Sequence, residues 1–334
     1  MLDEQASFPD MTIPDLASRA GDRSPILVTG APRSGSTWLG NVLCLAPNVG
    51  FVHEPFNQHT SQGLCRANFP HSFVHVTEEN EALYLGAMQD TLAWRFSLRA
   101  ELRAIPGRSN PSPPRALARL VRDYAYFEQM RRKDARMVIK DPIALFSADW
   151  IARRFGAKVV VLVRHPAGFV ASMQAAGFKM NFEAFSQQPA LMEGRLAPFA
   201  DEIRAAPRLS PSLEANTLLW RILHHHIDLL AQEHPDWIFV RHEDLSRDPE
   251  TAFPPFFERL GLPFTDEVRA GLTQFTSDQS ALGRFSLFGT RRRTMRSSTA
   301  SMQSYRSRLT PEEIATIRRL TSPIWERFYD ASDW

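Results

Sequence analysis

The sequence has only two cysteines, Cys44 and Cys65, so it lacks the cysteine framework that cross-links small secreted domains. Its start also lacks the basic segment followed by an apolar one that marks a signal peptide. All of its uninterrupted apolar runs are shorter than the roughly 20 residues needed to span a bilayer. We therefore expect a cytoplasmic protein without a membrane span.

The chain also has little excess charge of either sign, with a formal net charge of +2. Any basic patch must then be local, and the whole-chain charge gives no indication of a nucleic-acid partner. In contrast, apolar material is plentiful: 43% of the residues are hydrophobic and 23% are charged. This composition predicts a globular protein with a full core rather than a disordered chain.

Five short apolar runs are typical of buried strands. They are Ile26–Thr29, Val49–His53, Met137–Lys140, Lys158–Val163 and Trp237–Arg241. Their continuous apolar character, without strict alternation, favours a parallel sheet that is covered on both faces. Segments with helical spacing lie between them, one after the first run and one beginning at Pro166. We predict a three-layer, P-loop-like α/β fold, with a central, mainly parallel sheet of about five strands and helices on both faces.

The domain organisation follows from the absence of any linker-like stretch that would divide the chain into two folding units. We predict an N-terminal extension over 1–24 and a single domain over 25–334. Proline-rich and glycine-rich composition predicts loops in 105–114 and 187–212. These loops belong to two insertions, near 56–135 and 179–215. The sequence leaves the oligomeric state open.

A loop of phosphate-binding size follows the first predicted strand, in the sequence APRSGSTWL. Its glycines lead directly into a helix N-terminus, where unpaired N–H groups and the helix dipole favour an anion. The spacing matches the nucleotide-triphosphatase loop G-x-x-x-x-G-K-[ST], except that Ser36 replaces the lysine. The missing lysine argues for a nucleotide without a γ phosphate, and Arg33 supplies positive charge instead. The alternative is an ordinary glycine turn before a helix.

A second segment, VVVLVRHPAGFVAS, has a strand that ends at an arginine, followed by a helix that begins at a proline. Arg164 is that arginine, and Ser172 lies eight residues further on. An arginine at the carboxyl edge of a strand can reach a phosphate in the crevice where α/β folds bind ligands. Alternatively, Arg164 forms a surface ion pair and the Ser172 hydroxyl bonds to its own helix.

Together these segments resemble the two nucleotide-binding motifs of sulfotransferases that use 3′-phosphoadenosine 5′-phosphosulfate (PAPS). PRSGSTWL is similar to the 5′-phosphosulfate motif, and VVVLVRHPAGFVAS to the 3′-phosphate motif. The resemblance implies PAPS as co-substrate, adenosine 3′,5′-bisphosphate as product and no required metal. It implies that the nucleotide is contacted by Arg33, Ser34, Gly35, Ser36, Thr37, Trp38, Arg164 and Ser172. Arg33 and the segment IKDP make the chain more similar to the tyrosylprotein and carbohydrate branch than to the cytosolic branch.

Transfer of a sulfuryl group requires a base for the acceptor hydroxyl and cations for the departing phosphate. Glu54 follows the second predicted strand, 21 residues after Arg33, and the resemblance to tyrosylprotein enzymes implies that it is the base. His53 is the alternative base, although consecutive strand residues point to opposite faces. The resemblance likewise implies that Lys140 contacts the sulfuryl or bridging oxygen alongside Arg33. Taken singly, such residues are more commonly solvated or ion-paired.

Several other residues admit functional interpretations. His242 lies where relatives often carry a tyrosine near the nucleotide, and it is not assigned a role. Three adjacent histidines at 224–226 are expected on the surface or partly buried, because consecutive helix positions diverge and do not favour a metal site. The segment 290–309 is rich in arginine and serine, and the resemblance implies a loop that closes over the nucleotide. The residues concerned are Arg291, Arg292, Arg293, Arg296, Ser297, Ser298, Tyr305, Arg306 and Arg308.

Two competing functions remain beside the sulfotransferase. A magnesium-dependent P-loop nucleoside-triphosphate enzyme would use Asp141 at the end of a strand, although the missing loop lysine opposes it. A non-catalytic binder of an anionic polymer would use the arginines of 290–309. The acceptor of the sulfotransferase is a hydroxyl of a small molecule, sugar or peptide. Its pocket is expected where the two insertions, 56–135 and 179–215, follow the strands.

Overall fold

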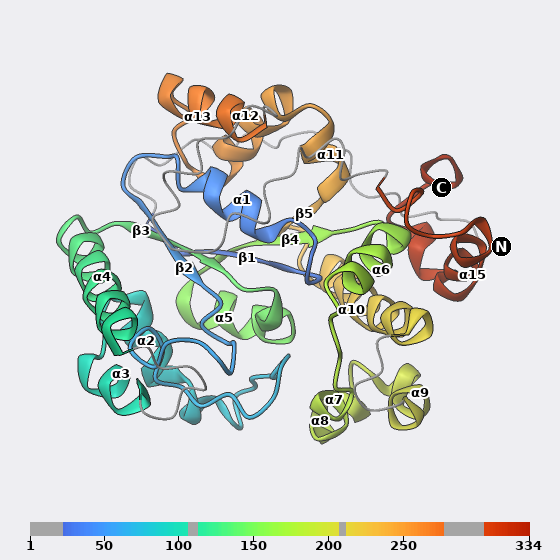
Figure 1. Ribbon diagram of the computed structural model, residues 1–334, viewed down its shortest axis with the longest axis horizontal. Coiled ribbons are helices and arrows are strands. Elements are labelled where there is room, and N and C mark those ends of the chain that lie inside the picture. The colour runs from blue at the N-terminus through green and yellow to red at the C-terminus, as the bar shows by residue number, and fades with distance from the viewer. Residues whose placement is uncertain (1–22, 106–112, 207–211, 277–303) are drawn as a thin grey trace.

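The computed structural model describes residues 23–105, 113–206, 212–276 and 304–334, which are coloured in Figure 1. Its centre is a sheet of five parallel strands in the order β2-β3-β1-β4-β5. The strands are β1 (Ile26–Gly30), β2 (Val49–His53), β3 (Arg136–Lys140), β4 (Lys158–Val163) and β5 (Ile238–Arg241). The five predicted strands are confirmed, with at most one residue of difference at either end.

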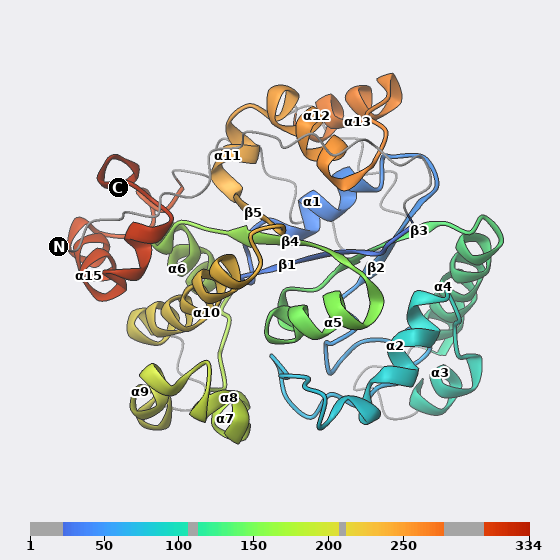
Figure 2. The same cartoon turned by 180° about the vertical axis from the view of Figure 1, so that it is seen from behind.

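Helices cover both faces of the sheet, so the predicted three-layer fold is confirmed (Figure 1). One layer contains α1 (Ser36–Leu43), α11 (His242–Arg247), α12 (Pro249–Leu260) and α13 (Asp266–Thr276). The opposite layer contains α5 (Ala148–Phe155), α6 (Pro166–Ala175) and α10 (Leu213–Glu233), and α15 (Pro311–Thr321) packs against α6 and α10 (Figure 2).

Alternate residues of each strand enter the two halves of the core. On β4, Val160 and Leu162 pack with α1 and α12, whereas Val159, Val161 and Val163 belong to the larger cluster on the α5, α6 and α10 side. All of these side chains are buried. Burial on both faces explains why the strands appear in the sequence as continuous apolar runs.

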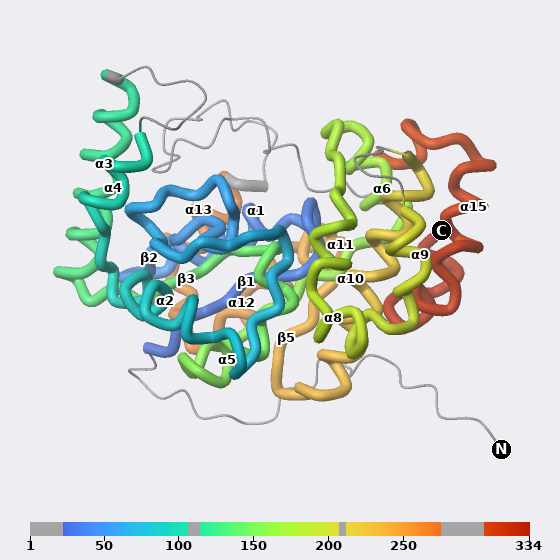
Figure 3. Tube along the Cα trace, turned by 90° about the horizontal axis from the view of Figure 1, so that it is seen from below, coloured from blue at the N-terminus to red at the C-terminus, as the bar shows by residue number. Residues whose placement is uncertain are grey.

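The two predicted insertions contain more helix than their proline content suggested. The first contains α2 (Leu85–Leu92), α3 (Leu98–Ala104) and α4 (Pro113–Arg132), and the second contains α7 (Glu183–Ser186), α8 (Pro189–Glu193) and α9 (Ala200–Ala205). The prolines at the start of α4 and α8 occupy first-turn positions, where the missing N–H costs no hydrogen bond. The loop predictions for 105–114 and 187–212 were therefore wrong in part, and 106–112 and 207–211 lie outside the described residues. Figure 3 shows α2 and α4 beside β2, α3 beside α4, and α8 and α9 beside α10.

The described ranges also contain short 3-10 segments. They are η1 (Glu81–Leu83), η3 (Pro142–Ser147), η4 (Ala197–Phe199), η5 (Ile324–Arg327) and η6 (Ala331–Asp333). Among the helices of the described ranges, none is long and apolar enough to cross a membrane.

Candidate functional site

The loop between β1 and α1 has the backbone geometry of an anion-binding turn. Gly30 and Gly35 have φ angles of 125° and 88°, which favour glycine. A Cβ on Gly30 would collide with the carbonyl of Leu162 on β4, and one on Gly35 with the imidazole of His242. Helix α1 begins directly after Gly35, so the N–H groups of its first turn lack intrahelical acceptors. The predicted phosphate loop therefore has both the turn and the N–H donors without intrahelical acceptors that an anion-binding loop needs.

The side chains of this loop differ in where they point. Ser34 is fully buried, and its hydroxyl has no hydrogen-bond partner in the described part of the chain. Ser36 is buried, whereas Thr37 is partly exposed. The indole of Trp38 packs edge-on against Phe253 of α12, with ring centroids 5.4 Å apart. The Trp38 ring is thus a packing group between two helices, which leaves its backbone N–H as its contribution to the loop.

The two motifs, far apart in sequence, come together at the carboxyl ends of β1 and β4. The Nε of Arg33 donates a hydrogen bond to the Oγ of Ser172 over 3.3 Å. The Nη1 of Arg164 donates to the backbone carbonyl of Arg33. Arg33 is exposed and has a left-handed φ of 64°, a conformation that is held only where the surroundings compensate its cost. Three of the predicted nucleotide-binding residues therefore form one connected group.

This group lies in a strongly positive environment. Arg164 is only 7% exposed, and burial lowers its pKa, while Glu243 opposes that shift and Arg33 adds to it. The neighbouring His165 is buried, and burial together with the charges of Arg306 and Arg164 lowers its pKa to about 3. Burial is the larger cause of this shift, and the arginines add to it, while the Glu243 carboxylate lies beside them.

The described end of the late basic segment belongs to this environment. The ring of Tyr305 stacks on His165, with centroids 5.2 Å apart, and the charge of Arg308 acts on Arg164. The other residues singled out in this segment, at 291–293 and 296–298, lie outside the described residues.

Glu54 and Lys140 form a second group, at the carboxyl ends of β2 and β3. The Nζ of Lys140 donates to the Oε1 of Glu54, and the Nδ2 of Asn57 donates to its Oε2 over 2.8 Å. Burial alone would raise the pKa of Glu54, but the charges of Lys140 and His53 and these hydrogen bonds together hold it below its usual range. The carboxylate is therefore ionised at neutral pH.

His53 does not point away from Glu54, as the strand alternation had suggested. Its Nε2 lies 3.8 Å from the Oε1 of Glu54. Strand β2 ends at His53, and Glu54 has a left-handed φ of 48°, so the two residues are not consecutive positions of one strand. Both candidate bases thus lie at the same place.

Asp141 has a structural set of partners. Its Oδ2 accepts a hydrogen bond from the N–H of Phe56, and its Oδ1 accepts from the N–H groups of Ile143 and Ala144. The residue is fully buried, and burial followed by the charge of Glu54 raises its pKa to about 7. These bonds tie the loop after β2 to the start of η3. Within the described ranges, no group of three or more His, Cys, Asp or Glu residues could hold a metal ion.

Buried groups around Arg164 escaped prediction from the sequence. His224 and His226 of α10 are 0% and 3% exposed, so the expected surface positions were wrong, and His225 alone is partly exposed. Trp220 lies one turn before His224, with the two rings stacked 4.0 Å apart. The i, i+4 spacing of a tryptophan and a histidine was the available signal, but it is also typical of ordinary core packing.

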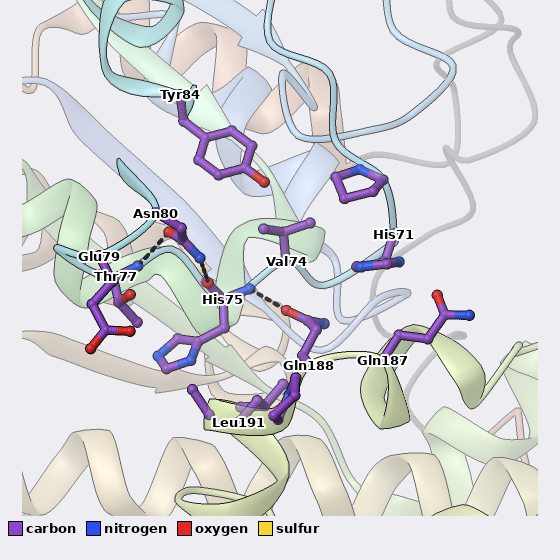
Figure 4. Close-up of a pocket in the computed structure, with 13 residues that line it drawn as sticks. His71, Val74, His75, Thr77, Glu79, Asn80, Tyr84, Gln187, Gln188 and Leu191 are labelled. Carbon is purple, nitrogen blue, oxygen red and sulfur yellow. Dashed lines mark hydrogen bonds between the residues drawn. The ribbon is translucent and has the colours of Figure 1, made fainter. Parts of the chain in front are cut away.

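A cavity of about 210 Å³ lies where the two insertions meet (Figure 4). Its walls include Tyr84 and His75 of the first insertion and Gln188 of the second. Gln188 connects the second insertion to the first through two hydrogen bonds: its Oε1 accepts from the N–H of His75, and its Nε2 donates to the carbonyl of Phe73. The hydroxyl of Tyr84 points toward Val74 across the cavity.

Comparison with known proteins finds several similar solved structures. The chain resembles the sulfotransferase domain of a Synechococcus olefin synthase, at 20% identity over 95% of this chain and 99% of that one, with a TM-score of 0.44. A mouse sulfotransferase complexed with PAP gives 14% identity over 90% and 84% of the two chains, with a TM-score of 0.44. A Mycobacterium avium sulfotransferase gives 13% identity over 92% and 78%, with a TM-score of 0.42.

The comparison with curated proteins finds no match. The model of the sulfotransferase family, in contrast, matches residues 25–266, which include both motifs, Glu54 and Lys140. This match covers most of the chain, and the family implies sulfotransferase activity. The chain belongs to the sulfotransferase family.

Proposed function

We propose that the protein transfers a sulfuryl group from PAPS to an acceptor hydroxyl. The observation that carries this proposal is the connection of the two motifs, in which Arg33 bonds to Ser172 and Arg164 bonds to the carbonyl of Arg33. A nucleotide with phosphates on both its 5′ and 3′ sides needs two anion sites held at a fixed separation. The loop 33–38 serves the 5′ phosphosulfate, and Arg164 with Ser172 serves the 3′ phosphate.

Glu54 is the base in this proposal. It removes the proton of the acceptor hydroxyl while the acceptor oxygen attacks sulfur in line, and the bond between sulfur and the phosphate oxygen breaks. Lys140 and Arg33 stabilise the charge that develops on the sulfuryl oxygens and on the leaving phosphate. The ion pair between Lys140 and Glu54 supports these roles, because it places a base and a cation side by side. The pair also supports the resemblance to the tyrosylprotein and carbohydrate branch.

The cavity between the insertions is the proposed site for the part of the acceptor that lies away from the reacting hydroxyl. An aromatic stack leads to it from the Glu54 side. Phe56 stacks on Phe69 at 4.3 Å, and Phe69 stacks on Tyr84 at 5.1 Å. Polar groups on the cavity wall suit an acceptor with hydrogen-bonding groups, whether small molecule, sugar or peptide.

Ligand binding without metal tests the nucleotide assignment. Adenosine 3′,5′-bisphosphate should raise the melting temperature in the presence of a chelator, because a ligand that binds only the native state stabilises it by mass action. Adenosine triphosphate with magnesium is the comparison. No shift with saturating bisphosphate, together with a clear shift with the magnesium nucleotide, would reject the proposal in favour of a triphosphate enzyme.

A further inference from the structure

The backbone on either side of Arg164 is held by side chains from two other elements. Arg164 follows the last residue of β4 and precedes α6, so its own N–H and C=O lie beyond the strand register. Buried backbone groups of this kind need partners. Their partners fix the direction in which the side chain leaves the backbone, and the bond to the carbonyl of Arg33 holds its guanidinium end.

Helix α10 supplies partners for both groups of Arg164. The Nε1 of Trp220 donates to the carbonyl of Arg164 over 2.9 Å. The N–H of Arg164 points at the Nε2 of His224, 3.5 Å away. The Nδ1 of His224 lies 2.9 Å from the carbonyl of Trp220, so a single neutral tautomer satisfies the whole arrangement. In that tautomer Nδ1 donates to Trp220 and Nε2 accepts from Arg164.

The N–H of His165, in the same peptide as the Arg164 carbonyl, is held from the other side of the sheet. The N–H of His165 donates to the Oε1 of Glu243 over 3.1 Å, and the hydroxyl of Tyr329 donates to the Oε2 of the same carboxylate over 2.9 Å. Three successive backbone groups are thus fixed by side chains. Trp220 and His224 are fully buried, so neither is exposed to a ligand.

We propose that Trp220 and His224 are positioning residues that aim the Arg164 guanidinium at the 3′ phosphate of the nucleotide. The inference rests on the proposed function, which assigns the 3′ phosphate to Arg164. At metal sites, groups that orient a ligating side chain commonly change affinity about 10–100-fold when they are removed, and we expect an effect at the lower end of that range for Arg164. The pair would therefore affect recognition of the 3′ phosphate more than recognition of the rest of the nucleotide, which Arg164 reaches only through its bond to the carbonyl of Arg33.

The test compares two probes that differ only in that phosphate, adenosine 3′,5′-bisphosphate and adenosine 5′-monophosphate. Trp220→Phe removes the indole N–H and keeps a large aromatic ring. Trp94→Phe is a matched control, because Trp94 is also buried and its Nε1 donates to the carbonyl of Ala135 over 2.8 Å, far from Arg164 in the fold. Dissociation constants for both probes are measured by calorimetry on folded variants.

Trp220→Phe should weaken the bisphosphate about 10-fold and leave the monophosphate within about twofold, whereas Trp94→Phe should leave the ratio of the two constants unchanged. In an Arg164→Ala background, Trp220→Phe should cause no further loss. If Arg164→Ala changes the ratio of the two dissociation constants and Trp220→Phe does not, the positioning role is overturned. This holds whether Trp220→Phe leaves both affinities intact or lowers both equally. If Arg164→Ala itself leaves the ratio unchanged, the nucleotide assignment fails instead. His224→Gln, which keeps an acceptor, should lose less affinity than His224→Leu.

Discussion

The Nζ of Lys140 bonds to the Oε1 of Glu54, which joins the carboxyl ends of two neighbouring strands. Lys140 is 4% exposed, so its ammonium group has little access to water. A buried cation requires such a partner, and the carboxylate in turn is kept ionised. The base and the cation proposed for transfer thus depend on each other, and the first two predictions concern this pair.

Glu54→Gln should lower turnover about 10²–10⁴-fold, because glutamine preserves the shape of the side chain and cannot take the acceptor's proton. Affinity for adenosine 3′,5′-bisphosphate should stay near that of the wild type, since the nucleotide group lies at β1 and β4. Turnover is measured with labelled PAPS and a productive acceptor. His53→Gln is the control and should retain most activity. The reverse order of the two defects would make His53 the base.

Lys140→Met should slow transfer and move the acidic limb of the pH profile of kcat upward. In the wild type the pKa of Glu54 is below its usual range, so activity is lost only when the pH falls through that lowered value. Without the lysine charge, the burial that remains raises the pKa, and protonation inactivates the base at higher pH. Lys133→Met, at an exposed position after α4, is the control. If the acidic limb of the Lys140→Met profile lies at the same pH as that of the wild type, Lys140 does not control the ionisation of Glu54.

Tyr84→Phe tests the cavity as the acceptor side. The change removes one hydroxyl and leaves the stack on Phe69 intact. We expect a several-fold higher KM for the acceptor, roughly the loss of one hydrogen bond, and an unchanged affinity for the bisphosphate. Tyr124→Phe on the exposed face of α4 should change neither quantity. Equal KM values for the two variants would place the acceptor elsewhere.

Asp141→Asn separates a structural carboxylate from a magnesium ligand. In the variant, the NH₂ group of the amide would face a backbone N–H that now donates a hydrogen bond to the carboxylate. Two donors would then face each other, so the free energy of unfolding should fall by about 1–3 kcal/mol. Urea unfolding measures this loss. Magnesium should leave the melting temperature of the wild type unchanged. A magnesium-dependent rise that the variant abolishes would restore the triphosphate enzyme as the function.

His226→Phe should reduce the sensitivity of the fold to acid. Burial holds the pKa of His226 well below its ordinary value, so between that ordinary value and the lowered one the unfolded chain binds a proton that the native protein does not. Stability is therefore present above about pH 6.5 and is lost as the pH falls, by about 1.4 kcal/mol per pH unit for one such group. Phenylalanine keeps the stack on Phe146. The slope should be shallower in His226→Phe and unaltered in His59→Phe, an exposed control; equal slopes in both variants would contradict the prediction.

The strands and the turn between β1 and α1 were predictable because their signals are local. A strand buried on both faces, such as Lys158–Val163, is apolar at nearly every position, and a loop that opens a helix needs glycine at fixed spacing. The relation of His53 to Glu54 was not predictable, because it depends on a left-handed residue that ends the strand. The hydrogen bond of Trp220 was equally unpredictable, since its partner is a carbonyl 56 residues away.

The strand order has a consequence for synthesis on the ribosome. β1 emerges first, yet it pairs with β3 and β4, with Leu27 opposite Ile139 and Val159. β1 can therefore pair along either edge only after more than a hundred further residues have been made, at about 5–20 residues per second. During that interval β1 lacks both of its neighbouring strands, and contacts so distant in sequence form slowly. We expect the nascent chain to depend on chaperones until β4 has left the exit tunnel, a dependence that ribosome profiling of chaperone-bound chains would detect.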